Sequence, residues 1–509
     1  MMVLVSPTQT PRPAARRAAP LRLSDALRLR VLYEDATEYG SAVTSQCDAT
    51  VRRACAAIVA VRKREGLASV VARSSELLAA ALASGGLGEL YERPGVLRPA
   101  CLYPPAGQVR PVALQVERPA GEVVATIELS AAFIAELARW TGEWYRGARA
   151  PRGGPARALW DALADVDALV PVGPAPTPPP REATFVGHAT VAIHPPSARL
   201  LFDPFLFPPS PRYPATYQPL TARDLGPLDA VFVSHSHPDH FDVGSLLYLG
   251  AETPIYVPAV ERESLLAVDM VWRLRELGFR RVQPLRWYDA VQVGACRVTA
   301  LPFYGEQPTT GARYHPEARN AGNLYLVDDG QRRQALAVDA GQDEAGDVKR
   351  LAAEAHRRYG PLDILWGGYR AFAVYPIHYL FSSVARYLLF VPPEQWAVRQ
   401  HMMNDAADLL DTAESWGARA VVPYADGGAP WYWELGLGPR LDGSGRVNPV
   451  VDPRPEVVAG AAAARSASGD ALIPSPVRVA LLRPGDSLSL QGGESRVLRR
   501  RPHAWPYPE

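Results

Sequence analysis

Apolar and polar positions along the first 180 residues follow both helical and strand-like spacing. Apolar side chains set among charged ones predict a helical start from Leu21 to about Gly66. Alternation at 112–116 and 123–129 predicts two strands. Helical spacing at 131–145 and 155–169 predicts helices after them. We therefore expect an α+β unit at the amino terminus, and it contains no recognisable catalytic motif.

A proline-rich segment separates this region from the rest of the chain. Pro171 to Pro180 reads PVGPAPTPPP, which offers few backbone N–H groups to a helix or sheet and favours an extended connector. At 509 residues the chain also exceeds what one hydrophobic core usually serves. The sequence thus predicts two domains, residues 1–180 with the connector at their end and residues 181–509.

Short apolar runs broken by turns dominate the second domain. We expect strands at 183–193, 199–202, 230–233, 255–257, 298–301, 324–327 and 335–338. Helical spacing occurs at 261–277, 347–359 and 405–416. Strands interleaved with helices in this way predict an α/β domain, built as a sandwich of strands flanked by helices.

The charge balance and the apolar content exclude several classes of protein. Lys and Arg total 54 against 53 Asp and Glu, so no net charge draws the chain to nucleic acid or a membrane surface. No apolar run approaches the roughly 20 residues that a membrane-spanning helix needs, and the first residues lack the apolar core of a signal peptide. Four cysteines without CxxC spacing suggest neither a disulfide framework nor a Cys-ligated zinc site. We expect a cytoplasmic protein that binds neither nucleic acid nor membrane.

One short loop holds four side chains of the kinds that bind metal ions. It follows the apolar run 230–233 and reads SHSHPDH. Three of the ten histidines of the chain fall within six residues of this loop, together with an aspartate. His235 and His237 alternate and can both turn toward one ion. Asp239 and His240 lie one step further along and can serve a second ion.

This loop resembles the HxHxDH signature of the metallo-β-lactamase superfamily. The resemblance extends over about Thr184 to Trp433. Within that range, FVGHAT at 185–190 is similar to the superfamily's opening strand, and LFDP at 201–204 is similar to its second-strand aspartate turn. The resemblance implies a metallo-β-lactamase αββα sandwich preceded by a separate α+β domain. His188 within FVGHAT is either a pocket group or a histidine that is merely hydrogen-bonded in place.

The chain departs from the superfamily's hydrolases at two ligand positions. Their third histidine follows a strand, but after the run 297–302 this chain reads FYGEQ, so that Glu306 is the natural candidate. Asp339 in VDAG is similar to the superfamily's metal-binding aspartate. The last histidine is also missing, and Asp426 stands at its place as either a ligand or a residue lining the site.

These substitutions change the expected chemistry. With Glu306 in place of a neutral imidazole, one ion would have two histidines and a carboxylate, and carboxylate-rich mixed ligation suits iron better than zinc. An added anion also weakens the ability of a metal ion to lower the pKa of its bound water, which is a disadvantage in hydrolysis. The sequence therefore favours oxygen activation by iron over hydrolysis.

The motifs HxHxDH, FYGEQ and VDAG, behind an unrelated amino-terminal region, are similar to those of the chloramphenicol-pathway β-hydroxylase family. The resemblance implies a di-iron monooxygenase that uses O2 as co-substrate in nonribosomal peptide synthesis and antibiotic biosynthesis. Its substrate would be an amino acid held as a thioester on a peptide-synthetase carrier domain, and an external reductase would supply electrons. The resemblance assigns His235, His237 and Glu306 to one iron and Asp239, His240 and Asp339 to the other, with Glu306 and Asp339 also catalytic.

Several alternatives stay open. A dizinc hydrolase of the phosphodiesterase or lactonase type would need His315 or another residue to complete the first site. A non-catalytic binding protein would have little reason to keep so many ligand-type residues. Aromatic and arginine residues at 366–372 and 431–433 either line an amino-acid pocket or pack in the core, and His401 is a further candidate for the site. The amino-terminal domain either docks the carrier protein or forms a homodimer. The sequence identifies neither the amino acid nor the reductase.

Overall fold

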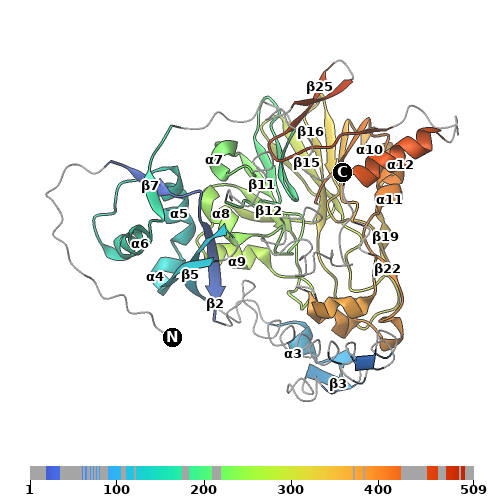
Figure 1. Cartoon of the computed structure of the whole chain (residues 1–509), viewed down its shortest axis with the longest axis horizontal. Coiled ribbons are helices and arrows are strands. Elements are labelled where there is room, and N and C mark those ends of the chain that lie inside the picture. The colour runs from blue at the N-terminus through green and yellow to red at the C-terminus, as the bar shows by residue number, and fades with distance from the viewer. Residues whose placement is uncertain are drawn as a thin grey trace.

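In a computed structural model of the chain, two β-sheets lie face to face and helices cover their outer sides (Figure 1). The structure describes residues 19–34, 90–93, 95–104, 110–119, 122–174, 183–208, 219–370, 373–381, 384–425, 455–467, 477–491 and 494–498, with isolated positions between 47 and 80.

The first sheet holds eight strands in the order β13-β12-β11-β10-β9-β8-β25-β26. In that order their bounds are Val282–Leu285, Ile255–Pro258, Ala230–Phe232, Leu200–Phe202, Thr190–Ile193, Ala183–Gly187, Ser487–Gln491 and Glu494–Leu498. Strands β10 to β13 run parallel to one another, while β8, β9 and β10 pair antiparallel. The parallel strands therefore end at one edge of the sheet.

The second sheet holds seven strands in the order β14-β15-β16-β17-β20-β23-β24. In that order their bounds are Ala290–Val293, Cys296–Pro302, Asn323–Asp328, Arg333–Leu336, Ile364–Gly367, Ala420–Pro423 and Arg478–Val479. Strands β14 to β17 pair antiparallel, and β17, β20, β23 and β24 are parallel.

Alternating side chains divide each sheet between two cores. In β10, Leu200 and Phe202 face the core shared by the two sheets, whereas Leu201 faces the outer core. In β20, Trp366 faces the shared core and Leu365 faces the opposite side. This period of two is what a strand buried on both faces requires. The predicted αββα sandwich is confirmed.

Helices cover the outer face of each sheet. Helices α8 (Val243–Leu249) and α9 (Met270–Glu276) pack on the first sheet. Helices α10 (Val348–Tyr359), α11 (Ala406–Trp416) and α12 (Glu456–Ala467) pack on the second. Shorter elements connect these layers; they are α7 (Ala222–Leu225), β18 (Gln342–Asp343), β19 (Gly346–Asp347), β21 (Ala373–Val374), β22 (Gln400–His401), η4 (Pro376–Phe381), η5 (Ala385–Phe390) and η6 (Pro393–Gln395).

Most of the described amino-terminal region packs against the first sheet's outer helices, whereas residues 90–102 pack with η4 and η5 in a separate core. Its elements are β1 (Leu21–Leu23), β2 (Arg28–Tyr33), β3 (Tyr91–Arg93), β4 (Val96–Leu97), α3 (Pro99–Leu102), β5 (Pro111–Arg118), β6 (Glu122–Glu128), α4 (Ala131–Ile134), α5 (Leu137–Arg146), α6 (Gly154–Asp165) and β7 (Leu169–Pro171). Apolar side chains of β2, α5 and α6 join those of α8 and α9 in one continuous core. The Thr141 hydroxyl donates to the Leu247 carbonyl at 2.9 Å, and the Tyr248 hydroxyl donates to the Leu27 carbonyl at 2.7 Å.

Two predicted helices are wrong in part. The described start of the predicted helix at 21–66 forms strands β1 and β2, because Leu29, Val31 and Tyr33 alternate with less buried residues and β2 pairs with β5. The predicted helix at 261–277 begins only at Met270, where the Asp269 carboxylate accepts from the Trp272 N–H and caps α9.

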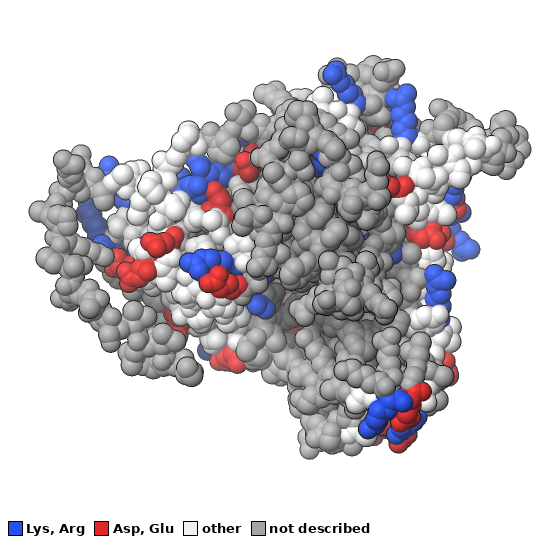
Figure 2. Space-filling model, viewed as in Figure 1, with Lys and Arg blue, Asp and Glu red and all other residues white. Residues whose placement is uncertain are grey.

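The other predicted elements correspond closely to observed ones. The predicted strands at 112–116 and 123–129 form β5 and β6, and the three-stranded sheet is ordered β2-β5-β6. Most of the proline-rich connector lies outside the described residues, and the domain boundary stays a prediction. Within the described part of the chain, no helix is long and apolar enough to cross a membrane. Basic and acidic side chains are interspersed on the described face of Figure 2.

Close contacts between glycines join the amino-terminal region to the first sheet's helices. A Cβ added at Gly142 in α5 would lie 2.3 Å from the Gly250 Cα, whereas one added at Gly460 in α12 would meet no described atom within 4 Å. Alanine in a helix interior stabilises by about 0.5–1 kcal/mol relative to glycine. We therefore expect Gly460→Ala to raise the free energy of unfolding slightly and Gly142→Ala to lower it by about 1–3 kcal/mol through overpacking. Urea unfolding of both variants measures this, and equal stabilisation would contradict the contact.

Candidate metal centre

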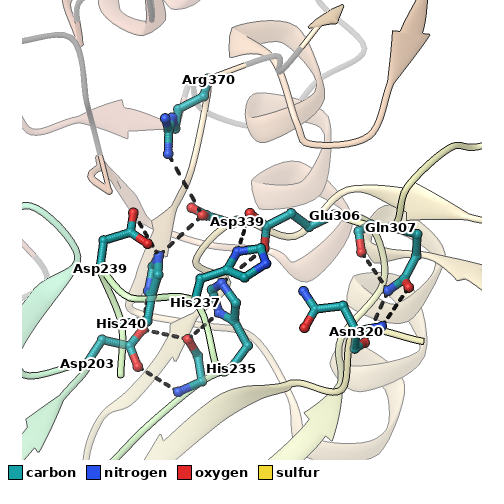
Figure 3. A network of polar contacts seen from close by, with 12 residues as sticks. Asp203, His235, His237, Asp239, His240, Glu306, Gln307, Asn320, Asp339 and Arg370 are labelled. Carbon is teal, nitrogen blue, oxygen red and sulfur yellow. Dashed lines mark hydrogen bonds and ion pairs between the residues drawn. The ribbon is translucent and has the colours of Figure 1, made fainter. Parts of the chain in front are cut away.

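The six residues that the sequence motifs predict gather at one edge of the two sheets (Figure 3). Four come from the loop after β11, one follows β15 and one follows β17. In that order they are His235, His237, Asp239 and His240, then Glu306, then Asp339. Loops at the ends of adjacent strands bring residues that are distant in sequence into one site.

Glu306 lies between the first two histidines of the motif. Its Oε1 is 2.9 Å from His237 Nδ1, and its Oε2 is 3.0 Å from His235 Nε2. One candidate ligand atom from each of the three residues lies within 4.8 Å of the others, which is close enough for a single ion. The structure thus brings together the set that the sequence predicted for the first ion.

His240 contacts both carboxylates of the second predicted set. Its Nε2 is 3.3 Å from Asp339 Oδ2 and 3.7 Å from Asp239 Oδ2. Asp239 also contacts His188, whose Nε2 lies 3.0 Å from the same Oδ2. Candidate ligand atoms of His235, His240 and Asp339 form a further group within 4.8 Å. Asp339 therefore lies near ligand-type atoms of both predicted sets, and His188 directly contacts the second one.

Four buried atoms of this group make no hydrogen bond of good geometry within the described part of the chain, although three of them lie 3.0–3.3 Å from an oppositely charged group of the centre. They are His235 Nε2, His240 Nε2, Glu306 Oε2 and Asp339 Oδ1. An unpaired buried donor or acceptor costs about 1–3 kcal/mol, and more when the group is charged. Imidazole nitrogens and carboxylate oxygens are common ligands of zinc and iron. The residues present therefore fit a pair of metal ions, and their assignment as ligands stays a prediction.

The carboxylates around His240 favour a positive charge at that position. Although burial lowers the pKa of His240, the carboxylates of Asp239, Asp339 and Asp203 raise it well above its ordinary value. Burial raises the pKa of Asp239, but His240 and His188 outweigh this effect and hold it well below its usual range. Without metal, a proton on His240 can supply the charge. A bound ion would take the place of that proton, so metal uptake releases it.

In the first predicted set, His235, His237 and Glu306, burial and the neighbouring groups shift the pKa of Glu306 and that of His235. Burial raises the pKa of Glu306, but His237 and His235 outweigh burial and lower it below its ordinary value. Burial, followed by the nearby His240, lowers the pKa of His235. An ionised carboxylate beside neutral imidazoles is the state in which all three groups can bind a metal ion.

Comparison with known proteins identifies the fold around this centre. Residues 198–372 match the family model described as "Beta-lactamase superfamily domain". Residues 198–372 are therefore similar to the domain of this superfamily, and the fold around them is the metallo-β-lactamase fold. This range contains all six residues of this chain that are predicted to bind metal ions.

Solved structures extend the likeness of fold to the amino-terminal region. The structure of CmlA, a diiron β-hydroxylase from Streptomyces venezuelae, aligns with 94% of this chain and 99% of its own, with a TM-score of 0.58 and 16% identity. A mutant of CmlA β-hydroxylase gives the same TM-score over 94% of this chain and 100% of its own, at 15% identity. The fold along most of this chain is therefore similar to that of CmlA.

A curated relative has a shorter match. It is the 4-amino-L-phenylalanyl-[CmlP-peptidyl-carrier-protein] 3-hydroxylase of Streptomyces venezuelae, which is 30% identical over 162 residues. The matched segment spans 31% of this chain and 28% of the relative. The sequence match thus covers less than a third of either protein.

Asp203 supports the superfamily's metal-binding loop from the neighbouring strand. Its Oδ1 accepts from the Ser234 N–H at 2.6 Å, and its Oδ2 accepts from the Ser234 hydroxyl at 2.6 Å and contacts His240 Nδ1 at 2.9 Å. The register of β10 and β11 pairs Phe202 with Phe232, which sets Asp203 beside the start of the loop. A carboxylate that binds the outer nitrogen of a ligand histidine orients the ring toward the metal.

Several residues of this centre have strained backbones. The φ angles of His188, Asp203 and Glu306 are 48°, 45° and 50°, in the left-handed region that side chains with a Cβ seldom adopt. Such strain persists where the surrounding structure over-determines it, and it concentrates at functional sites. Glu306 is held there by its N–H, which donates to the Met402 carbonyl at 3.2 Å.

Two further residues reach the centre from the second sheet's side. Arg370, which follows β20, has its Nη1 4.0 Å from Asp339 Oδ2. The Tyr387 hydroxyl in η5 is 2.8 Å from His237 Nε2. Arg370 lies within the stretch 366–372 of predicted pocket candidates, whereas Tyr387 could not be predicted because no local motif surrounds that tyrosine.

Other candidates lie elsewhere. His315 accepts from the Leu97 N–H at 2.8 Å and has Nδ1 3.0 Å from Glu317, so the structure does not bring it to the centre, as the alternative of a zinc hydrolase completed by His315 would need. His401 belongs to a separate, partly exposed group in which its Nε2 is 3.2 Å from Asp408 Oδ2, near the first turn of α11.

Two of the aromatic candidates pack in the core, and the others lie outside the described residues. Trp366 and Tyr369 are fully buried and pack in two hydrophobic cores, so the core alternative is confirmed for both. Asp426, Phe372 and the run Trp431 to Trp433 lie outside the described residues.

The support from Asp203 makes a testable prediction. In Asp203→Asn one carboxylate oxygen becomes an NH2 group that faces other donors, so His240 loses its fixed orientation. We expect metal affinity at the second position to fall about 10–100-fold. A chelator-competition titration measures it, with Asp229→Asn as the control, because the exposed Asp229 carboxylate accepts, among the described residues, from the Arg199 N–H alone. Unchanged affinity in Asp203→Asn would contradict the role.

Proposed function

We propose that this chain is a di-iron, O2-dependent monooxygenase that hydroxylates the β-carbon of an amino acid held as a thioester on a peptide-synthetase carrier domain. Two findings support the proposal. The fold matches that of a diiron β-hydroxylase along nearly the whole chain. A relative with 30% identity over the matched segment is named as a hydroxylase of a carrier-bound aminoacyl group.

The observation that carries the proposal is the position of Glu306. Both of its oxygens face a histidine of the HxHxDH loop, one at 2.9 Å from His237 and one at 3.0 Å from His235. Two imidazoles with one carboxylate form a ligand set that suits non-haem iron. A hydrolytic zinc ion would gain little from the added anion, because the anion weakens activation of bound water.

Tyr387 supports this ligand set by selecting the histidine nitrogen that faces the ion. A neutral imidazole carries a proton on one nitrogen and a lone pair on the other. If His237 Nε2 donates to the Tyr387 hydroxyl at 2.8 Å, Nδ1 carries the lone pair and faces Glu306. The arrangement therefore presents the lone pair of His237 where the first ion would bind.

The second ion would be held by Asp239, His240 and Asp339. When bound, the iron pair supplies the two electrons by which O2 can be split for transfer of one oxygen atom. In balance, O2, two electrons and two protons convert the β C–H bond to C–OH with release of water. An external reductase provides the electrons in this proposal, and the reaction takes place in the cytoplasm.

The partner follows from the relative's substrate. We infer an aminoacyl carrier domain of a nonribosomal peptide synthetase, in a natural-product pathway, and leave the amino acid open. The amino-terminal region is the candidate for carrier docking or for a homodimer interface. This region contacts α8, the helix that follows the HxHxDH loop at 234–240, since Arg28 Nη2 is 3.2 Å from Asp242 Oδ1 at the start of α8. The contact places the region close to the centre.

Metal identity tests the proposal first. The wild type, purified anaerobically with iron supplied, is expected to hold close to two irons per chain and to show the Mössbauer signature of a coupled diferric pair after oxidation. Glu306→His replaces the anionic ligand by a neutral one, so we expect loss of about half of the iron and an altered spectrum. Glu317→His is the matched control, because that glutamate lies more than half exposed on the same long loop.

A different outcome would overturn this assignment. Two tightly held zinc ions, no iron uptake and phosphodiesterase or lactonase activity would make the chain a hydrolase of the same fold.

The carrier requirement gives a separate prediction. An iron-loaded, chemically reduced enzyme given isotopically labelled O2 should transfer one labelled oxygen atom to an aminoacyl group on its carrier and none to the free amino acid. Mass spectrometry of the released amino acid measures the label. Label that comes from water, or equal reaction of the free amino acid, would contradict the monooxygenase or the carrier requirement respectively.

A further inference from the structure

Asn320 is a buried polar residue that nothing in the ligand set explains. Its side chain is 2% exposed. Within the described residues, neither its Nδ2 nor its Oδ1 has a hydrogen-bond partner. Burying an amide with both ends unpaired is costly, because each lost hydrogen bond to water is not replaced. Such a group is usually satisfied by a ligand or by ordered water.

The backbone of Asn320 is held firmly in place by the residue that follows Glu306. Gln307 Oε1 accepts from the Asn320 N–H at 2.9 Å, and Gln307 Nε2 donates to the Asn320 carbonyl at 3.1 Å. Gln307 is itself fixed by Arg313, whose Nη1 donates to Oε1 at 3.2 Å. The loop that places Glu306 in the metal centre thus also positions Asn320.

The Asn320 carboxamide is directed toward the metal centre. Figure 3 shows it pointing to the side on which His235, His237 and Glu306 lie. The chain that follows it runs along the metal loop, since Gly322 forms a β-bridge with His235 and the Asn323 N–H donates to the Ser234 carbonyl at 2.8 Å.

Two other buried asparagines differ from Asn320. Asn323 Nδ2 donates to the Leu285 carbonyl at 3.1 Å, and Asn404 Nδ2 donates to the Thr412 hydroxyl at 3.3 Å. Their amides therefore stabilise the fold. The amide of Asn320 makes no such contact with the described chain, and this difference separates a structural asparagine from one available to a ligand.

We propose that the Asn320 carboxamide binds the α-amino group and the carbonyl of the aminoacyl thioester. The carboxamide presents an acceptor and a donor side by side. An aminoacyl thioester presents an ammonium donor and a carbonyl acceptor on adjacent carbons, so the two groups match in a paired hydrogen bond. In this proposal the β-carbon would lie on the side of the predicted metal ligands, toward which the carboxamide points in Figure 3. This inference rests on the proposed function and adds the group that orients its substrate.

Binding of matched thioesters to the iron-loaded protein tests the proposal. The probes are a panel of aromatic and aliphatic L-aminoacyl pantetheine thioesters, each paired with its des-amino acyl analogue. We expect the wild type to prefer the aminoacyl member of the best-bound pair by roughly ten- to hundredfold, the usual effect of hydrogen bonds to a charged group. Asn320→Leu should abolish the preference. Asn320→Asp should keep it in part, because the carboxylate still accepts from the ammonium group.

Folding and metal content supply the control. Asn320→Leu should keep its iron and melt no lower than the wild type, since no protein atom loses a partner. Asn323→Leu removes the partner of the Leu285 carbonyl and should lower the melting temperature.

Two other results would contradict the role proposed for Asn320. If Asn320→Leu binds both members of the pair as the wild type does, or loses stability as Asn323→Leu does, the residue is structural and the proposal is wrong. If the iron-loaded wild type binds no thioester of the panel, the proposed function fails and this inference fails with it. The two failures are distinguished by whether the wild type binds any probe.

Discussion

Buried carboxylates and imidazoles at the edge of the two sheets require a positive charge among them, and the surrounding structure keeps them together. Asp203, Asp239 and Asp339 all lie close to His240. Ionised carboxylates are not buried together unless cations or hydrogen bonds compensate them. A proton on His240 would supply part of this positive charge, and the proposed metal ions would supply more. The strained backbones at His188, Asp203 and Glu306 are consistent with a site where the surrounding structure imposes the geometry.

The amino-terminal region contributes to that support. Helix α8 begins three residues after His240, and a Cβ at Gly244 in its first turn would lie 1.9 Å from the Leu29 carbonyl of β2. Arg28 pairs with the Asp242 carboxylate that caps the helix. The metal loop is therefore anchored on one side by the neighbouring strand β10 and on the other by a helix packed against the amino-terminal sheet. Whatever partner this region binds, its packing also bears on the geometry of the metal centre.

Adjacent residues on the loop after β15 serve two different purposes. Glu306 faces the histidines, and Gln307 turns away to clamp the backbone of Asn320. A change in this loop would alter both the ion's ligands and the group that we assign to the substrate. The proposed oxidation chemistry and the proposed placement of the substrate therefore depend on two adjacent residues of one loop.

Local sequence patterns determined a large part of this protein. Period-two runs predicted most strands of the sandwich, and the HxHxDH spacing, Glu306 and Asp339 predicted residues that the structure brings together. Local patterns failed where pairing or capping decided the outcome. The run containing Val31 forms β2 because β5 lies beside it, and α9 starts late because Asp269 caps it.

Tertiary structure alone decided the contacts that cross the fold. The contact of Asp203 with His240 depends on the parallel register of β10 and β11. The approach of Tyr387 to His237, and the direction of the unpaired Asn320 amide, depend on how distant loops pack. No spacing along the chain encodes such contacts, because each one joins segments whose relative position is fixed only when the two sheets close on their common core.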